Sequence, residues 1–458
     1  MTLKHIFYIG FTGLLLAGGG SCRKTETLDV DMSRYNVDNP QQTELDNWIT
    51  GQLTDPYNIQ LVYRFERNLT DVSRDVSPIK LEQVKPTAEA IINIFLKTYE
   101  KVAGPTFIKT YTPKQFVLYG SPSYNSNGTI TLGTADGGRR VVLYELNDLD
   151  FNNAAQVSRK MRTIHHEFTH IVNQIVAIPP EFRKVTNADY FEDWTSSDNT
   201  AGDAQALGFV SRYARSQYTE DFAEMTAHLL VEGQLWFDAY AKAGGDDAYE
   251  KLKRKEALVV DYFKQYFNIN FRDLQYEVAK VLREEYNDNS KSFLYALQNN
   301  LIANPLVVDF NAGIHYTEFG QSEQFAEVWD AVKSGLGVNG RTPVNFNIVF
   351  LSSSVMQIRH SYTNAAGSSF SAWYDFNITV DANGDITFER FDDGTNRAEY
   401  NNGRNSQVAA GFKPLNDYLD GHVFRGDWIP ESAGPRNYLK FGGFYVKDDP
   451  ANYFYGKF

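Results

Sequence analysis

The sequence predicts an α+β protein, in which helices and a small mixed sheet are followed by an antiparallel β-rich region. Three observations support this prediction. Helical periodicity dominates up to about residue 287, short strand-like runs interrupt it between 115 and 146, and polar and apolar residues alternate after Pro343. The 458 residues suffice for two or three domains. We therefore expect one domain over 46–287 and a second over 288–458.

The N-terminus predicts export and lipid anchoring. Residues 1–21 combine a cationic start at Lys4 with an apolar stretch too short to span a bilayer comfortably, which is typical of a signal peptide. The single cysteine, Cys22, follows directly, as in bacterial lipoprotein signals, and ordinary cleavage near Ser21 is the alternative. We expect a lipid on Cys22 to hold the protein at the outer membrane, on either its periplasmic or its outer face. Residues 22–45 are polar and aperiodic, which predicts a tether.

Local patterns place the elements of the first domain. Asn152 and Asn153 can cap a long helix that ends before Pro179. A helix is expected after Pro86 and Thr87, and strands are expected in the runs QFVLY, ITLGT and VVLYEL. The remaining helical patterns cover 47–63, 219–243, 247–266 and 272–286.

The C-terminal region shows strand alternation. After a helical pattern at 288–302, the alternate residues from Tyr374 to Val380 share one face, and Asn383-Gly384 predicts a two-residue hairpin turn. The surrounding DANGD segment is better explained as a hairpin than as a calcium loop, because its glycine comes too early for an EF-hand. The alternation and the aromatic content of 14% suit a lipocalin-like barrel or a sandwich.

Charge and motif content exclude several function classes. The net charge of −13 argues against a nucleic-acid partner, because phosphate binding needs a basic face. A single cysteine allows neither an intrachain disulfide nor a cysteine-based zinc cage. The chain contains no nucleotide-binding loop and no G-x-S-x-G nucleophile motif.

The pattern His166-Glu167-Phe168-Thr169-His170 predicts a zinc site. His166 and His170 are one helical turn apart, so both imidazoles share a face. Glu167 lies beside them, where a carboxylate can take a proton from a water on the metal. The opposite face of the helix is an apolar stripe suited to a core, formed by Val157, Met161, Ile164, Phe168, Ile171 and Ile175.

A third metal ligand is expected downstream. The segment 211–230 is the richest in candidates: Glu220 and Glu224 share a helical face, and His228 lies one turn further on. A carboxylate ligand with a second acid one turn later suits zinc, because the second acid can orient a ligating imidazole. Glu224 and His228 are the alternatives to Glu220 as the third ligand. His165 is expected to be a neighbour of the site, because it lies about 100° away from the direction of His166.

The segments HHEFTHIVNQ and YARSQYTEDFAE together resemble the substrate-import-associated zinc metallohydrolase lipoproteins, a family of zinc peptidases. They are similar, more remotely, to the catalytic domain of the lethal factor protease. The resemblance implies a zincin-like metallopeptidase domain in which one Zn²⁺ is held by His166, His170 and Glu220. It further implies that Glu224 supports a ligand from behind, and that the Tyr213 hydroxyl stabilises the oxyanion.

The resemblance covers about residues 45–287 and also implies a setting. Such lipoproteins occur in bacteria that feed through TonB-dependent importers with surface-lipoprotein partners, so we expect hydrolysis of peptides or glycopeptides for import. The fifty residues from His170 to Glu220 leave room for a loop with Trp194, which we expect to shape the substrate cleft. The ending GGFYVKDDPANYFYGKF resembles a domain of unknown function from lipoproteins of the same bacteria. The alternative function is a non-catalytic surface lipoprotein that binds substrate and retains a zinc site.

Overall fold

A computed structural model describes residues 42–136 and 138–458. The predicted signal peptide 1–21, the predicted lipid attachment at Cys22 and most of the predicted tether 22–45 lie outside the described residues. In the described part of the chain, no helix is both long enough and apolar enough to cross a membrane.

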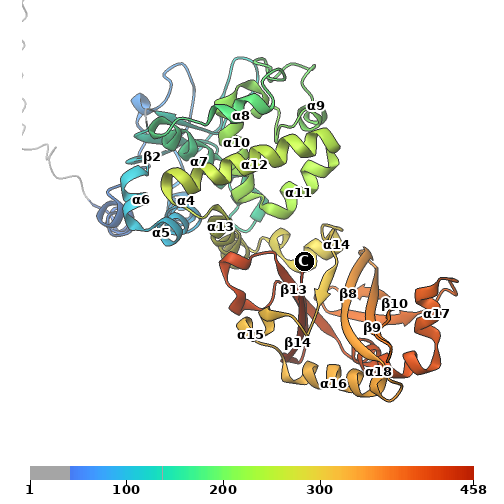
Figure 1. The fold of residues 1–458 in the computed structure, drawn as a ribbon. Coiled ribbons are helices and arrows are strands. Elements are labelled where there is room, and N and C mark those ends of the chain that lie inside the picture. Colours follow the sequence, from blue (N-terminus) through green and yellow to red (C-terminus); the bar gives the residue numbers. More distant parts are fainter. Residues whose placement is uncertain (1–41, 137) are drawn as a thin grey trace, which may run out of the picture. The chain divides into compact units, whose positions relative to one another are not determined.

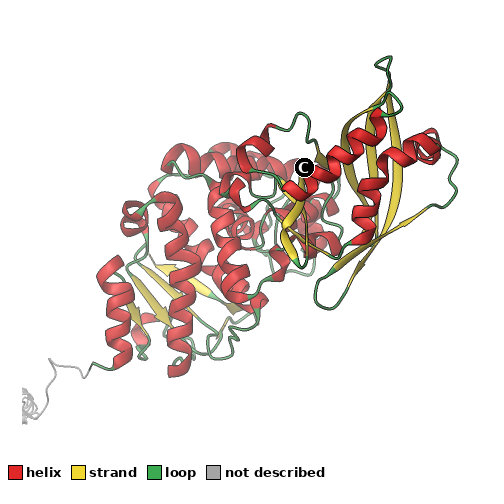
Figure 2. Cartoon of the chain, turned by 90° about the horizontal axis from the view of Figure 1, so that it is seen from below, coloured by secondary structure: helices red, strands yellow, loops and turns green. Residues whose placement is uncertain are grey.

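Residues Ile49–Phe458 form one compact unit, which begins with helices around a small mixed sheet (Figure 1; Figure 2). The strands of this sheet are β1 (Gln60–Val62), β2 (Gln115–Leu118), β6 (Arg140–Leu143) and β5 (Gly133–Asp136), in that order. The first three run parallel, and β5 pairs antiparallel with β6 at one edge. The sheet confirms the predicted mixed topology. A short hairpin, β3 (Ser123–Tyr124) and β4 (Ile130–Thr131), connects β2 to β5.

Helices make up most of this first part. Their bounds are α2 (Glu44–Ile49), α3 (Asp55–Tyr57), α4 (Leu81–Ala90), α5 (Lys97–Ala103), α6 (Pro105–Tyr111), α7 (Ala154–Ile175), α8 (Pro180–Val185), α9 (Ala201–Ala206), α10 (Tyr218–Val231), α11 (Gln234–Ala243), α12 (Asp246–Phe267) and α13 (Phe271–Tyr286). Two π-helical segments, Thr50–Thr54 and Ile91–Leu96, continue α2 and α4.

Three boundaries differ from the sequence prediction. The pattern over 47–63 contains both helices and strand β1. Helix α4 begins at Leu81, before Pro86 rather than after it, and contains this proline as its sixth residue. The pattern over 219–243 is divided at Gly233, whose φ of 84° ends the helical path, so that α10 and α11 are separate helices.

Helix α7 carries the H-E-x-x-H pattern. Of the two predicted caps, Asn153 is the N-cap residue, and its side chain accepts a hydrogen bond from the Gln156 amide at 3.3 Å. The predicted apolar stripe is buried from Val157 to Ile171. Helix α7 packs against α10 and against the edge strand β5 of the sheet. Ile175, the last residue of the stripe, is 49% exposed because the helix ends there.

The last part of the chain forms a closed antiparallel barrel, so the sandwich alternative is excluded (Figure 1). Around the barrel the strands are β10 (Ser369–Val380), β11 (Ile386–Phe391), β12 (Phe424–Asp427), β13 (Phe441–Val446), β14 (Asp449–Lys457), β7 (Leu306–Val308), β8 (Thr342–Ser352) and β9 (Val355–Thr363). Closure depends on β7, which pairs with both β14 and β8. This strand precedes the alternating region that the sequence singled out.

Helices complete the core of the barrel. They are α14 (Phe293–Gln298), α15 (Ile314–Phe319), α16 (Glu323–Gly337), α17 (Ala398–Arg404) and α18 (Ser406–Gly421). Phe293 of α14 and Trp329 of α16 belong to the same buried cluster as Phe376 of β10. The predicted face of β10 is therefore the inner face, although its last residue, Val380, is only partly buried.

The hairpin between β10 and β11 is one residue longer than predicted. Asp381 N donates to Asp385 O at 3.0 Å, which closes a loop of three residues, and Gly384 has a φ of 81°. This is a turn followed by a left-handed glycine, rather than a two-residue turn at Asn383-Gly384. The DANGD segment is a hairpin, as expected.

Candidate metal centre and active site

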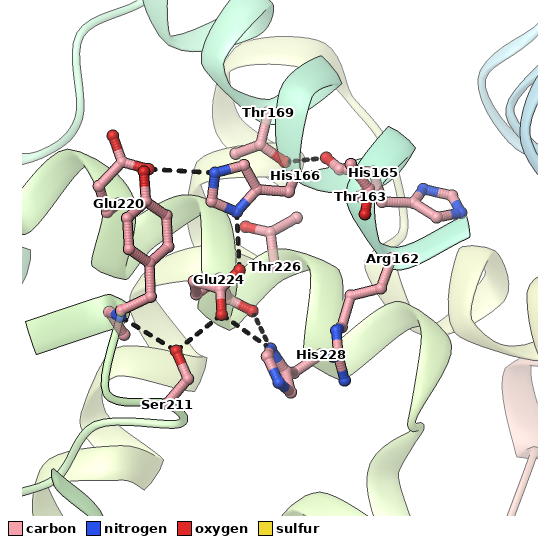
Figure 3. Close-up of polar contacts among 12 residues, drawn as sticks. Arg162, Thr163, His165, His166, Thr169, Ser211, Glu220, Glu224, Thr226 and His228 are labelled. Carbon is pink, nitrogen blue, oxygen red and sulfur yellow. Dashed lines mark hydrogen bonds and ion pairs between the residues drawn. The ribbon is translucent and has the colours of Figure 1, made fainter. Parts of the chain in front are cut away.

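Helices α7 and α10 pack against each other and bring three donor side chains together. Oε2 of Glu220 lies 3.1 Å from Nε2 of His166 and 3.1 Å from Nε2 of His170, and the two imidazole nitrogens are 3.0 Å apart. Figure 3 shows Glu220 facing His166 across the space between the two helices. These are the three side chains that the resemblance implied as ligands, and they come from two separate segments.

The donor triangle fits a zinc ion. Zinc bonds to imidazole nitrogen and carboxylate oxygen are about 2.0–2.2 Å long, so tetrahedral ligands lie roughly 3.3 Å apart. The observed separations of 3.0–3.1 Å are close to that spacing. Two imidazoles and one carboxylate are also a common donor set of catalytic zinc sites. Among the described residues, these three form the group of side chains able to share one metal ion.

Glu224 holds the rear of the His166 ring. Its Oε1 lies 2.8 Å from Nδ1 of His166, and its Oε2 accepts a hydrogen bond from the Ser211 hydroxyl at 2.7 Å (Figure 3). Because an ionised carboxylate only accepts, Nδ1 carries a proton, so a metal ion that displaces the other ring proton would bind Nε2, on the side of Glu220 and His170. Glu224 therefore occupies the supporting position that the resemblance implied.

The electrostatics of the cluster favour a cation. Burial lowers the pKa of His166, but hydrogen bonds with Glu220 and Glu224 outweigh burial and raise this pKa to about 10. Burial also raises the pKa of the two carboxyls, yet their contacts with histidine hold both values well below the usual range. The site thus holds a positive charge strongly, and a metal ion competes with the proton for it.

The two other histidines near the pattern lie outside the cluster. Nδ1 of His228 lies 2.8 Å from the backbone oxygen of Glu224, and its ring stacks on Trp236 with centroids 5.4 Å apart. The ring of His165 points away from His166 and is fully buried beside Phe95, where burial lowers its pKa to about 3 (Figure 3). His165 is thus a neighbour of the site, as expected, and has a packing role.

Glu167 and Tyr213 both face the cleft that leads to the cluster. The Tyr213 ring lies 5.9 Å from that of His166 and 5.2 Å, edge to face, from that of Trp194. Burial, the charge of Glu220 and a hydrogen bond with it raise the pKa of Tyr213 far above its usual value. The phenol therefore stays protonated and can donate a hydrogen bond.

The cleft has a volume of about 440 Å³. One wall is the exposed face of α7, and the other is the segment from Asn125 to Gly133, which includes β4 and the start of β5. A Cβ on Gly133 would lie 2.6 Å from the Thr163 side chain, so glycine allows β5 to pass close over α7. Trp194 closes one side of the cleft, as expected of its loop.

Several supporting residues carried no sequence signal. Ser211 is a common residue type, and only its contact with Glu224 marks it. Lys255 and Asp221 form an ion pair of 2.7 Å with both side chains fully buried, and the Tyr190 hydroxyl donates to Asp221 at 2.8 Å. This pair fixes the first turn of α10 to α12. Pairs of this kind join distant segments, so local patterns do not reveal them.

The geometry agrees with the comparisons to known proteins. Residues 38–272, more than half of the chain, match a family described as "Putative zinc-binding metallo-peptidase". The chain belongs to this family. The family match includes all three donors and Glu224, Glu167 and Tyr213, and it ends before the barrel.

A crystal structure of a "putative zinc-binding metallo-peptidase" from Bacteroides caccae ATCC 43185 is also similar. The sequence identity is 28%, the match covers 54% of this chain and 97% of that chain, and the TM-score is 0.47. None of the curated proteins matches this chain.

Proposed function

We propose that the protein is a zinc metallopeptidase that hydrolyses peptide bonds in peptides or glycopeptides. One observation carries the proposal: His166 and Glu167 both line an open cleft, and the donor cluster has three members among the described residues. Structural zinc sites are normally closed by four protein ligands, whereas catalytic sites keep one position for water or substrate. Membership of the zinc-binding metallopeptidase family supports the same function.

The chain supplies the groups that peptide hydrolysis needs. A bound zinc ion contributes Lewis acidity, which makes water nucleophilic near neutral pH. His166, His170 and Glu220 would hold the ion, and Glu224 keeps the Nε2 lone pair of His166 turned toward it. The Glu167 carboxylate takes the proton of the attacking water and returns it to the leaving amine. The protonated Tyr213 hydroxyl donates a hydrogen bond to the oxyanion.

A Glu167→Gln substitution tests this proposal. The amide has the shape of the carboxylate but cannot accept the proton, so the rate should fall by about 10²–10⁴ while bound zinc stays unchanged. The measurements are cleavage of a mixed peptide library by mass spectrometry and zinc content of the purified protein. Glu181→Gln, at an exposed position on α8, is the matched control. Cleavage by Glu167→Gln at the wild-type rate, or no cleavage by zinc-loaded wild type, would contradict the proposal. The latter result would favour a substrate-binding lipoprotein.

The cellular setting is a separate part of the proposal. The export signal and Cys22 support a lipid anchor at the outer membrane, and the resemblance supports a role beside a TonB-dependent importer and its surface lipoprotein. A Cys22→Ser protein should lose acyl labelling and leave the membrane fraction. Equal retention of the Cys22→Ser protein in the membrane fraction would contradict the anchor.

A further inference from the structure

One end of the cleft carries two arginines in a strongly acidic protein. Arg159 and Arg162 both line the cleft, together with Thr163, and all three belong to α7. The net charge of the chain is −13, and the catalytic end of the same cleft contains the carboxylates of Glu167 and Glu224. The cleft is therefore polarised along its length, with cationic side chains at the end away from the metal cluster.

The spacing along α7 sets the distance between the two ends. Arg159 precedes His166 by seven residues, which is two helical turns, so both residues face the same side of α7. Two turns correspond to roughly 10 Å along the helix axis. Arg162, one turn from His166, lies roughly 6 Å along the axis. An extended peptide rises about 3.3 Å per residue, so the two arginines lie about two to three substrate residues from the metal cluster.

Each guanidinium group is held in place by one ion pair at this end of the cleft. A nitrogen of Arg159 lies 3.3 Å from Glu145, and Nη1 of Arg162 donates to Glu232 at 2.6 Å. Both arginines line the cleft, whereas neither Glu145 nor Glu232 does. The surface at this end of the cleft is therefore formed by the guanidinium groups and not by their partner carboxylates.

The arginine side chains also keep donors for a ligand. A guanidinium has five N–H donors in a planar fork that matches a carboxylate, and each ion pair engages one nitrogen. The Arg159 side chain is 49% exposed and that of Arg162 is 30% exposed, so both can be reached from the cleft. The facing wall contributes the neutral side chains of Asn125, Asn127 and Thr129, which would not repel an anion.

We propose that Arg159 and Arg162 form a subsite for a carboxylate group of the substrate, about two to three residues from the bond that is cleaved. This inference rests on the proposed function and names its substrate class: peptides with an acidic side chain, or with a free terminal carboxylate, at that position. The two guanidinium groups select the substrate by charge, while the metal cluster and Glu167 act on the peptide bond.

Paired peptides test the subsite on the full-length zinc-loaded protein. Starting from a peptide cleaved in the library, Glu is compared with Gln at each position up to four residues on either side of the cleaved bond. At one position near the third residue, kcat/KM for the Glu peptide should exceed that for the Gln peptide by about 10- to 100-fold, the usual effect of a charge-assisted hydrogen bond. Free and amidated termini distinguish a terminal from a side-chain carboxylate, and either source supports the subsite.

Arginine variants show whether the preference belongs to this subsite. In Arg159→Gln the Glu-to-Gln ratio should fall toward one, Arg159→Lys should retain part of it, and unchanged zinc content shows that the site is intact. Arg183→Gln, at an exposed position on α8, is the matched control and should keep the ratio. A wild-type ratio near one, or a ratio that persists in both Arg159→Gln and Arg162→Gln, would overturn the inference.

A binding measurement separates this inference from the proposed function. Fluorescently labelled Glu and Gln peptides, taken as matched pairs from the library without selection for cleavage, are titrated against zinc-loaded Glu167→Gln protein, in which turnover is not needed. Tighter binding of the Glu peptide, lost at high salt, supports the subsite even if the wild type cleaves nothing. Equal binding of both peptides overturns the subsite while leaving peptide hydrolysis unaffected.

Discussion

The Glu224 carboxylate joins His166 to Ser211. One of its oxygens lies 2.8 Å from Nδ1 of His166, and the other accepts the Ser211 hydroxyl at 2.7 Å. Because Ser211 Oγ also accepts the backbone N–H of Ala214 at 3.0 Å, the loop that carries Tyr213 is tied to the same carboxylate. The orientation of the imidazole ligand and the position of the candidate oxyanion donor thus depend on one side chain.

Glu224→Gln should lower zinc affinity by about 10- to 100-fold, the usual effect of losing the carboxylate behind a ligating histidine. The chain should remain folded, because glutamine keeps the volume. Competition with a chelator measures the affinity, and circular dichroism checks the fold. Ser211→Ala is the companion variant with a smaller expected loss, because it leaves the contact with His166 in place. An unchanged affinity in Glu224→Gln would show that Glu224 does not support the ligand.

The choice of third ligand makes a second prediction. Glu220→Ala should lose zinc, because it removes one of three protein donors, whereas His228→Ala should keep it. Nδ1 of His228 is directed at the Glu224 backbone oxygen rather than at the cluster. Zinc content of both proteins after dialysis decides the matter. Full zinc in Glu220→Ala together with loss in His228→Ala would refute the ligand set.

Tyr213→Phe should lower kcat by a factor of about 10²–10³, the usual effect of losing one oxyanion donor, and should keep zinc. The ring remains packed against Trp194, so KM should change little. Tyr218→Phe, a partly exposed position on α10, is the control. An unchanged kcat in Tyr213→Phe would remove Tyr213 from the mechanism.

Lys255→Met should reduce the free energy of unfolding by about 3–5 kcal/mol, because it leaves the Asp221 carboxylate buried without its cation. The double variant Lys255→Met/Asp221→Asn should recover part of this loss, because the uncompensated charge is gone. Urea unfolding with saturating chelator measures both, so that zinc binding does not contribute. Equal stabilities of wild type and Lys255→Met would show that the pair is not coupled to the fold.

Acid should weaken the barrel through His360. Its ring is fully buried and stacks on Phe412 with centroids 3.9 Å apart, and burial lowers its pKa to about 3. The unfolded chain binds this proton near pH 6.5, so the stabilisation is complete above pH 6.5 and is lost as the pH falls from 6.5 toward 3, at about 1.4 kcal/mol per unit. His360→Phe should reduce this slope between pH 6.5 and 4.5, measured by urea unfolding with chelator. The same slope in both proteins would contradict the assignment.

The local part of the site was predictable from the sequence. His166, Glu167 and His170 lie within five residues, so helix geometry alone places both imidazoles on one face of α7, and the apolar stripe identifies the opposite face. The N-cap of α7 was also predictable, since Asn153, one of the two candidate cap residues, accepts a hydrogen bond from the Gln156 amide. Short-range periodicity also predicted four consecutive strands of the barrel, from β8 to β11.

The tertiary structure decided what depends on contacts between distant segments. Glu220, Glu224 and His228 lie on one helix at four-residue intervals. The packing of α10 against α7 determines that Glu220 contacts the Nε2 atoms of both His166 and His170. It also determines that Glu224 contacts Nδ1 of His166. Closure of the barrel likewise depends on β7, whose three residues carry too short a pattern to be recognised alone. Residue periodicity determines which face of an element is apolar, whereas the partner of each face is set by long-range packing, which a single sequence does not encode in any local pattern.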